Sequence, residues 1–357
     1  MTSMIKRPAC WMATLAWVML VGGCLVGLTG LSGMALAETL MEPEDASKAS
    51  ISVKKIGEPD VVMMGAYLND VQAIDLKNHN YMVDFYLWFR WKNPDIDPSS
   101  SLEFVNHSES WGTVITKSYE EPEVLPDGQL YQVIHVEGRM SRKLDLRNYP
   151  FDKQSISIEI EDAVRDTLGQ KYVVDSIGVN PELKLPGFQY KPATMQSYDY
   201  THPTNFGDTR VDQGSSYSRV SIELRITRPI INAVVKNVLP ILLTTICCSF
   251  VFLLSPKLVD SRFQIAIFSI FSIVALQITV GEDLPTVEYL TLLDTLYLYA
   301  YVYCIAVIAL LIYITKLGHE KATDMAASVK ADRWGGGLLF GFYLMASGLV
   351  ITLALVR

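Results

Sequence analysis

The hydrophobic pattern changes once along the chain, from short alternating runs to long uninterrupted apolar stretches. Between residues 51 and 228, runs such as 81–91 and 155–161 alternate apolar with polar positions and are separated by turn residues. Alternation with a period of two predicts antiparallel β-strands, and a β-sandwich is the natural way to close them. Residues 198–218 are too polar for a core strand throughout, so we expect a long exposed hairpin there.

Four long uncharged stretches fill the last third of the chain. They cover residues 238–254, 263–280, 295–315 and 334–356. Each is close to the roughly 20 apolar residues that a helix needs to cross about 30 Å of hydrocarbon, so all four are predicted to span a membrane. The alternating pattern ends at Arg228-Pro229, a few residues before the first stretch. A connection this short transmits force, whereas a flexible linker would dissipate it.

An earlier apolar run, residues 11–31, has the layout of a secretory signal peptide. It follows Lys6 and Arg7 and precedes the small residues at 35–37, so we expect cleavage before Glu38. An uncleaved anchor helix is the alternative, and lipidation at Cys24 is less favoured because the preceding residues make a poor lipid-attachment motif. The predicted organisation is a signal peptide over 1–37, a β-sandwich over 38–228 and a four-helix membrane domain over 229–357.

Charges in the links between the spans predict their orientation. The first and third links carry the basic residues, namely Lys257, Arg262, Lys316, Lys321, Lys330 and Arg333. The second link carries acidic residues and no basic one, namely Glu282, Asp283 and Glu288. Because basic links stay on the cytoplasmic side, the sandwich and the C-terminus are expected on the outer side of the membrane.

Composition argues against several classes of function. A net charge of −8 without a basic patch argues against a nucleic-acid partner, because phosphate binding needs clustered Lys and Arg. The region expected outside has no cysteine, so no disulfide can brace it. No nucleophile elbow and no phosphate-binding loop occur, which argues against an enzyme.

The five histidines show no pair at metal-ligand spacing, so the sequence predicts neither a metal site nor a cofactor. His135 lies near the middle of a predicted strand and could sense pH, because imidazole titrates near neutrality. A structural role in the core or at the surface is the commoner one for such a histidine.

Several short motifs occur in a fixed order and spacing. They are Tyr149-Pro150-Phe151-Asp152 after a strand, Arg228 closing the last strand, Pro240 inside the first span and Leu284-Pro285 after the second. Pro240 lies twelve residues beyond Arg228, and Pro285 lies twenty-five beyond Asp260. Together these features resemble the pentameric ligand-gated ion channel family in its bacterial branch.

The resemblance covers residues 51–357, nearly all of the predicted mature chain. Animal relatives close the loop around residues 146–153 with two cysteines, which this chain lacks, as bacterial members do. The resemblance implies a homopentamer in the inner (plasma) membrane of a bacterium. Each subunit would contribute a periplasmic ligand-binding sandwich and four membrane helices.

The second span is the predicted pore helix, because it is short, begins with Asp260 and ends in acidic residues. A carboxylate at the membrane edge is costly unless it faces water. At helical spacing one face carries Asp260, Gln264, Phe268, Phe271, Ala275, Ile278 and Glu282. A ring of five Asp260 carboxylates would concentrate permeating monovalent cations at the inner mouth.

Phe271 and Ile278 are the candidates for an apolar gate, and ordinary helix packing is the alternative for any one aromatic. Phe268 departs from the family, which usually has a slim residue there, and would add a second tight constriction. Arg262 is expected to point away from the lumen, because it lies two residues from Asp260 on the helix.

By the resemblance, coupling between the domains passes through Asp152, Arg228 and Pro285. The Asp152 carboxylate would pair with the Arg228 guanidinium next to the loop 281–289, so that a shift of the sandwich pulls on the top of the pore helix. A plain salt bridge at a domain boundary is the alternative. A buried pair is in any case poor evidence for stability, because desolvation offsets the attraction.

The candidate ligand site departs most from the family, whose agonists bind between subunits in a box of aromatic residues. For such a box this chain offers Tyr86, Tyr119 and Tyr217. Ala163 stands where many relatives have another aromatic, so the cage for an amine is incomplete. Glu161 and Asp162 could supply a carboxylate to a cationic ligand, or titrate themselves if protons are the agonist. Solvated surface carboxylates are the alternative.

The sequence therefore predicts a homopentameric ligand- or proton-gated cation channel in contact with membrane lipid. A non-conducting receptor that binds a periplasmic solute is the alternative, and the apolar rings at Phe268 and Phe271 favour it. A transporter is less well supported, because the spans show no inverted repeat and no pair interrupted by Gly or Pro.

Overall fold

The structure, a computed structural model, describes residues 57–207, 214–320 and 325–356. The predicted signal peptide lies outside the described residues. The described chain divides into two compact units. One contains Val53–Lys236 together with Thr279–Thr291, and the other contains Asn237–Ile278 and Leu292–Arg357.

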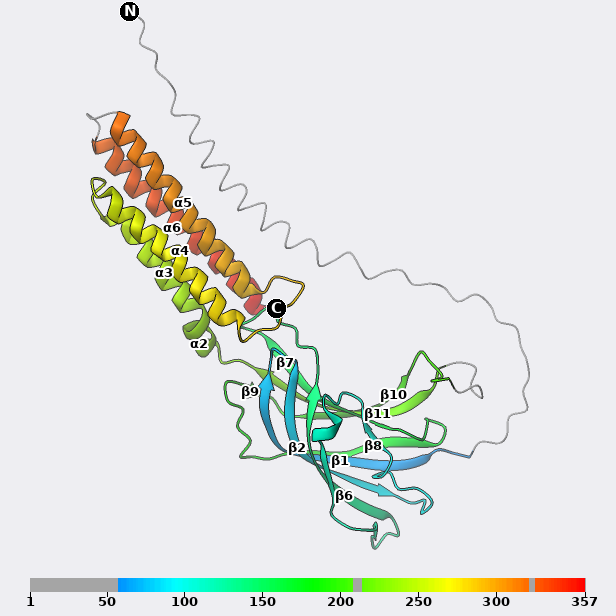
Figure 1. Cartoon of the computed structure of the whole chain (residues 1–357). Helices are drawn as coiled ribbons and strands as arrows, with labels where there is room; N and C mark the ends of the chain where they lie inside the picture. The colour runs from blue at the N-terminus through cyan, green and yellow to red at the C-terminus, as the bar shows by residue number, and fades with distance from the viewer. Residues whose placement is uncertain (1–56, 208–213, 321–324, 357) are drawn as a thin grey trace, which may run out of the picture. The chain divides into compact units, whose positions relative to one another are not determined.

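The first unit is a sandwich of two sheets (Figure 1). The six-stranded sheet has the order β4 (Val114–Lys117), β6 (Leu130–Ser141), β2 (Asn80–Trp91), β1 (Asp60–Asp75), β8 (Gln170–Val179), and β5 (Glu123–Val124) also pairs with β6. The five-stranded sheet has the order β10 (Thr194–Thr201), β11 (Ser216–Thr227), β7 (Lys153–Asp162), β3 (Leu102–Phe104), and β9 (Gln189–Tyr190) also pairs with β11. A short helical turn, η1 (Ser110–Gly112), precedes β4.

The predicted fold class is confirmed, with one refinement of the strand directions. The pairs are antiparallel except for β1 with β8, which is parallel. In the segment 198–218, where an exposed hairpin was expected, β10 is almost entirely exposed and pairs antiparallel with β11, which is largely buried; residues 208–213 between them lie outside the described residues.

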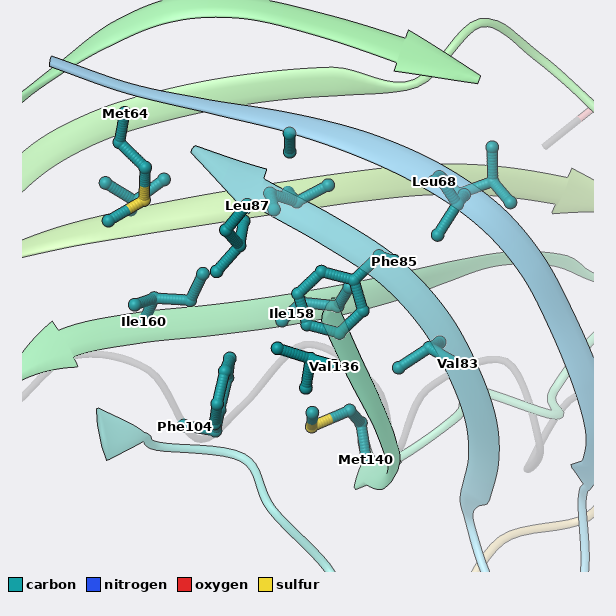
Figure 2. Packing of buried hydrophobic residues seen from close by; sticks show 14 of the residues in the cluster. Met64, Leu68, Val83, Phe85, Leu87, Phe104, Val136, Met140, Ile158 and Ile160 are labelled. Atoms are coloured by element: carbon teal, nitrogen blue, oxygen red, sulfur yellow. The ribbon is translucent and has the colours of Figure 1, made fainter. Parts of the chain in front are cut away.

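Strand alternation fills the core between the two sheets. Every second residue of β2, including Val83, Phe85 and Leu87, is buried. In Figure 2 these side chains lie against Ile158 and Ile160 of β7 in the other sheet. Fully burying an apolar side chain of this size contributes about 1.5–3 kcal/mol, so this unit forms a core without a disulfide.

The helices that are long and apolar enough to cross a membrane, as predicted, lie mostly in the second unit. The spans are Ile230–Leu253, Val259–Gly281, Leu292–Lys316 and Asp332–Val356. The chain is therefore a multi-pass membrane protein. The helical elements are α2 (Ile230–Ala233), η2 (Val234–Val238), α3 (Leu239–Ser249), η3 (Phe250–Leu253), α4 (Val259–Gly281), α5 (Leu292–Glu320) and α6 (Met325–Val356).

The first span begins earlier than the apolar pattern indicated, at Ile230 instead of residue 238. Its first turns include η2, a π-helical segment that ends just before Pro240. Proline lacks an N–H and clashes with the preceding turn, so a local widening of the helix accommodates it. Lys236 and Asn237 lie in this segment, which is why hydropathy alone placed the start too late.

Candidate functional site

Helix α4 has one face covered by its own chain and one face that is not. Arg262, Ala266, Ser269 and Ile273 are its buried residues. The uncovered face carries all the residues predicted to line a pore, namely Asp260, Gln264, Phe268, Phe271, Ala275 and Ile278. Phe268, Phe271 and Ile278 are 67%, 65% and 60% exposed. Such large apolar side chains need cover from something outside this chain.

The uncovered face of α4 is wider than the predicted line of residues. Ile267 and Val274, which lie beside that line, are also exposed. These two residues are seven positions apart and so lie on the same side of that line, while Ser261 and Ser272 are exposed on its other side. The apolar part of the exposed face therefore extends beyond the predicted line on one side only.

Arg262 lies on the face of α4 opposite to Asp260, as its helical position predicted. Its Nη2 donates to the carboxylate of Asp332 on α6, and its Nε donates to the carbonyl oxygen of Val251 at 3.0 Å. Both side chains of the pair are only 3% exposed. The positive charge at the start of α4 is therefore neutralised inside the helical unit, while Asp260 stays exposed.

The predicted pair of Asp152 and Arg228 forms in the sandwich unit. Arg228 Nε donates to Asp152 Oδ1 at 3.0 Å, and the Asp152 side chain is 1% exposed. Gln154 Nε2 donates to the second carboxylate oxygen at 2.8 Å. The guanidinium also stacks on aromatic rings, 4.5 Å from the ring of Phe188 and 5.1 Å from that of Tyr149. Burial raises the pKa of Tyr149, and the nearby Arg228 opposes the shift.

The loop around residues 146–153 meets the loop that follows α4. The backbone N–H of Leu146 donates to the Tyr289 hydroxyl at 3.0 Å, and the Arg147 guanidinium lies 5.2 Å from the centre of the Tyr289 ring. Lys77 Nζ, on the turn between β1 and β2, donates to the carbonyl oxygen of Glu282 at 3.2 Å. Pro285 lies partly buried in the same loop. The sequence named this loop, but it gave no reason to single out Tyr289 as the contact.

Glu161 sits in a buried ion pair instead of facing solvent. It is 3% exposed, and its Oε1 accepts a hydrogen bond from Arg219 Nε at 2.6 Å. Its Oε2 lies 3.0 Å from His202 Nε2. The Arg219 guanidinium lies 3.6 Å from the centre of the Tyr200 ring, a cation–π arrangement. An arginine of the protein therefore already occupies the position over an aromatic face that an organic cation would take.

His202 is at the centre of an aromatic group on the β10–β11 hairpin. Its ring centroid lies 4.8 Å from that of Tyr200, 5.4 Å from that of Phe206 and 5.7 Å from that of Tyr217. We call Glu161, Tyr200, His202, Phe206, Tyr217 and Arg219 the hairpin cluster. Of its members the sequence predicted only Glu161 and Tyr217. Tyr200, His202 and Phe206 lie in a polar segment whose pattern resembles an ordinary loop, and Arg219 on β11 carried no motif.

Asp162 has a structural role, since it is 3% exposed and its hydrogen bonds hold a turn. Its Oδ1 accepts from the backbone N–H groups of Val164 and Arg165 at 2.8 and 2.7 Å, and its Oδ2 accepts from Ser101 Oγ at 2.5 Å. The alternative of solvated surface carboxylates therefore fails for both acids. Of the two, Glu161 is the one whose carboxylate meets other candidate ligand-binding groups.

Tyr86 and Tyr119 lie in the other part of the sandwich from Glu161, Asp162 and Tyr217. Tyr86 is on β2, where its ring stacks on that of His135 with centroids 4.3 Å apart. Tyr119 follows β4, and its ring centroid is 6.2 Å from that of Tyr131 on β6. The five candidate residues thus form two groups, one on each sheet, and a single subunit does not bring them together.

The fold also gathers a group of possible metal ligands that sequence spacing did not reveal. Asp84, His135 and Glu137 offer ligand atoms that all lie within 4.8 Å of one another. They come from β2 and β6, so neither the distance along the chain nor a motif connects them.

Comparison with known proteins identifies ion channels and receptors as relatives. The chain is 22% identical to gamma-aminobutyric acid receptor subunit beta-4 of Gallus gallus over 263 residues, which is 67% of this chain and 51% of that protein. It is 22% identical to subunit theta of the same receptor in Mus musculus over 262 residues, covering 67% of this chain and 39% of the relative. It is 24% identical to a proton-gated ion channel of Gloeobacter violaceus over 273 residues, covering 70% of this chain and 72% of that channel.

No family model matches the chain. Its match spans about half the length of the receptor subunits, 51% and 39%, and most of the bacterial channel, 72%. These relatives confirm the resemblance to the pentameric ligand-gated ion channel family that the motifs predicted, and they are channels or receptors and not enzymes.

Proposed function

We propose that the chain forms a homopentameric, ligand- or proton-gated cation channel in the inner membrane of a bacterium, with its sandwich and C-terminus in the periplasm. The observation that carries this proposal is the exposed face of α4. It bears a carboxylate at one end and large apolar side chains along its length, while Arg262, the basic residue in the first turns of the helix, is buried on the opposite face.

One copy of α4 cannot enclose a pore, so cyclic symmetry has to supply the other walls. Five copies would place a ring of Asp260 carboxylates at the inner mouth and attract permeating cations there. Rings of Phe271 and Ile278 would close the pathway by dewetting, and Phe268 would add a further narrow ring. Membrane lipid would cover the outward faces of the remaining helices, whose apolar residues are largely exposed.

Agonist binding would occur between neighbouring subunits. In a ring, the sheet that carries Tyr86 and Tyr119 in one subunit can face the hairpin cluster of the next, which supplies Glu161 and Tyr217. Because Arg219 already fills the cation position over Tyr200, a small organic cation would have to displace it. A ligand with an acceptor group for Arg219, or a proton taken up by the pair of His202 and Glu161, fits this arrangement better.

The negative charge of Glu161 is expected to set the agonist concentration at which the channel opens. Glu161→Gln keeps the shape of the side chain but removes the charge that holds Arg219 and His202. We expect the agonist concentration, or proton concentration, for half-maximal current to change at least about tenfold, because a lost charge-assisted hydrogen bond is worth about 1.5–3 kcal/mol. Current recordings over a series of pH values and candidate ligands measure this shift.

The matched control is Glu182→Gln, which removes an exposed carboxylate that is not next to a candidate ligand-binding residue and should leave the midpoint unchanged. If wild type and Glu161→Gln have the same concentration for half-maximal current, the hairpin cluster does not take part in agonist binding.

Cation preference is expected to depend on Asp260. Asp260→Ala removes the proposed carboxylate ring without disturbing the buried face of α4, so the protein should assemble but lose most of its preference for cations. Reversal potentials of purified protein in a planar bilayer, under a salt gradient with pH and ligand varied, measure the preference. The control Asp294→Ala lies in the first turn of α5 and should keep the wild-type reversal potential.

The alternatives give different results in the same bilayer. A non-conducting receptor, which the exposed Phe268 and Phe271 favour, would pass no current under any condition. A transporter would not require five subunits, so a pentamer seen by native mass measurement or imaging argues against it. Cation preference that survives Asp260→Ala would leave the channel standing but remove Asp260 as its selectivity ring.

A further inference from the structure

We propose that the outer face of the six-stranded sheet holds a binding site for one divalent transition-metal ion, formed by Asp84, His135 and Glu137. His135 Nε2 points at both carboxylates, 2.7 Å from Asp84 Oδ1 and 3.8 Å from Glu137 Oε1. One imidazole nitrogen and two carboxylate oxygens are a donor set that suits zinc and its neighbours in the transition series.

The strand register explains why these three side chains meet. Asp84 of β2 lies directly opposite Glu137 of β6, and Tyr86 lies directly opposite His135 in the same strand pair. Directly opposite residues point to the same face of a sheet with their Cβ atoms about 4.5–5.5 Å apart. The three ligands therefore come from a rigid two-strand ladder in the middle of a sheet and not from a mobile loop.

The carboxylates on this face repel one another unless a cation lies between them. Asp70 of β1 is the register partner of Asp84, so three carboxylates, Asp70, Asp84 and Glu137, form one row across neighbouring strands. Like charges in directly opposite positions destabilise a sheet. Within the described part of the chain, neither Asp84 nor Glu137 forms an ion pair with a lysine or arginine. A bound dication would relieve this repulsion.

The charged groups nearby have other partners. Arg139, two residues beyond Glu137 on β6, donates to Asn80 Oδ1 at 3.1 Å and has its Nε 3.8 Å from Glu109. Asp70 accepts hydrogen bonds from the Val71 backbone and from Gln72. Within the described residues, no lysine or arginine is thus paired with the carboxylates of Asp84 and Glu137.

The distances suit a small metal ion after a minor adjustment. Ligand atoms bound tetrahedrally at about 2.0–2.1 Å lie about 3.3 Å apart, and the observed 2.7 and 3.8 Å fall on either side of that value. Supporting groups hold two of the ligands in place. Asn69 Nδ2 donates to Asp84 Oδ2 at 2.6 Å, and the Tyr86 ring stacks on the imidazole at 4.3 Å. Solvent can reach the group, so water can complete the coordination.

Calcium and magnesium should bind much more weakly than zinc, because both prefer sites made entirely of oxygen ligands. The neighbouring hairpin of the other sheet offers a comparison. His202 also meets a carboxylate, that of Glu161, but Arg219 already neutralises this group. The site of Asp84, His135 and Glu137 therefore differs from the hairpin cluster in having two carboxylates and no arginine.

Metal binding would also influence the proposed agonist site, an effect that rests on the proposed channel function. Tyr86, a candidate ligand-binding residue, packs flat on His135. A metal that fixes the imidazole would fix the Tyr86 ring with it. Zinc is then expected to change the agonist response of the channel without occupying the agonist site.

The test is zinc titration of the tag-free, full-length protein in detergent, followed by calorimetry. We expect saturable binding of one zinc ion per chain, little heat with calcium or magnesium, and at least about a 100-fold weaker affinity for His135→Ala. Loss of a supporting residue alone costs about 10- to 100-fold at known metal sites, so loss of a ligand should cost no less. Glu137→Gln, at the solvent-facing edge of the site, should weaken binding while preserving the fold.

His202→Ala is the matched control and should bind zinc as the wild type does. No saturable zinc binding, or binding that His135→Ala and Glu137→Gln leave unchanged, would overturn the metal site. Current recordings with and without zinc test the second step separately. A protein that binds zinc but never conducts refutes the channel and not the metal site, whereas a conducting protein whose current ignores bound zinc overturns the proposed effect on Tyr86.

Discussion

Replacing Arg228 by Met is expected to lower the maximal agonist-evoked current at least about tenfold while the protein still assembles. The substitution leaves the Asp152 carboxylate buried with Gln154 as its remaining hydrogen-bond partner. Breaking a buried ion pair by removing one member costs about 3–5 kcal/mol. We expect the pair to contribute differently to the closed and open states, and a difference of about 1.4 kcal/mol between them already alters their balance tenfold.

The effect should be specific because of where the pair lies. Arg228 follows the last strand and is two residues from the first residue of α2, Ile230. Asp152 follows the loop whose Leu146 and Arg147 meet Tyr289, in the segment leading from the proposed pore helix to α5. We therefore expect the pair to influence both segments of chain that join the sandwich to the helices.

Patch-clamp or bilayer recording of equal amounts of protein provides the measurement. Arg225→Met is the control, because Arg225 lies three residues earlier, on β11, and is exposed. The double variant Arg228→Met/Asp152→Leu separates coupling from stability, since removing both charges should restore thermal stability without restoring the current. If the double variant regains both, the pair is only a structural salt bridge.

Replacing Arg262 by Met is expected to be the most destabilising single change in the helical unit. Asp332 would remain as a buried, unpaired carboxylate, and the carbonyl oxygen of Val251 would lose one donor and keep the backbone N–H of Leu254, at 3.3 Å. Both side chains of the pair are 3% exposed, so solvent cannot compensate, and the expected cost is about 3–5 kcal/mol. The start of α4, which carries Asp260, would lose its anchor to α6.

Size-exclusion chromatography of the detergent-solubilised protein after heating measures this loss, as the temperature at which the monodisperse peak disappears. Arg333→Met makes the same chemical change at an exposed neighbouring position and should have little effect. The double variant Arg262→Met/Asp332→Leu should recover most of the loss, because a buried pair can often be replaced by apolar residues of similar size. A double variant as unstable as Arg262→Met would mean that the bond to Val251, and not the ion pair, anchors the helix.

Much of the fold was readable from the sequence because periodicity reflects burial directly. Alternation in residues 81–91 and 155–161 predicted β2 and β7, and the four apolar stretches predicted the spans. The face of α4 was also predictable, since a straight helix fixes which residues share a side. The start of the first span was misjudged, because polar residues in the π-helical segment before Pro240 hide its helical character from a hydropathy pattern.

The candidate ligand site was predicted less well, and the reason is physical. Glu161 looked like an exposed strand carboxylate, but Arg219 and His202 from the neighbouring strand and hairpin enclose it. Arg219 lies 58 positions from Glu161 along the chain, and His202 lies 41 positions from it. A pairing across such separations leaves no periodic trace in the sequence. The same is true of Tyr289 and of the group of Asp84, His135 and Glu137.

The sequence by itself determined the order of a sandwich and four apolar helices, the exposed face of α4 and the motifs of its channel relatives. These properties depend on local spacing and on the transfer of side chains out of water, which act residue by residue. Only the tertiary structure decided which charges meet: Arg262 with Asp332, Arg219 with Glu161, and His135 with two carboxylates. Such contacts depend on strand register and helix packing, and many sequences with the same hydrophobic pattern could set these differently.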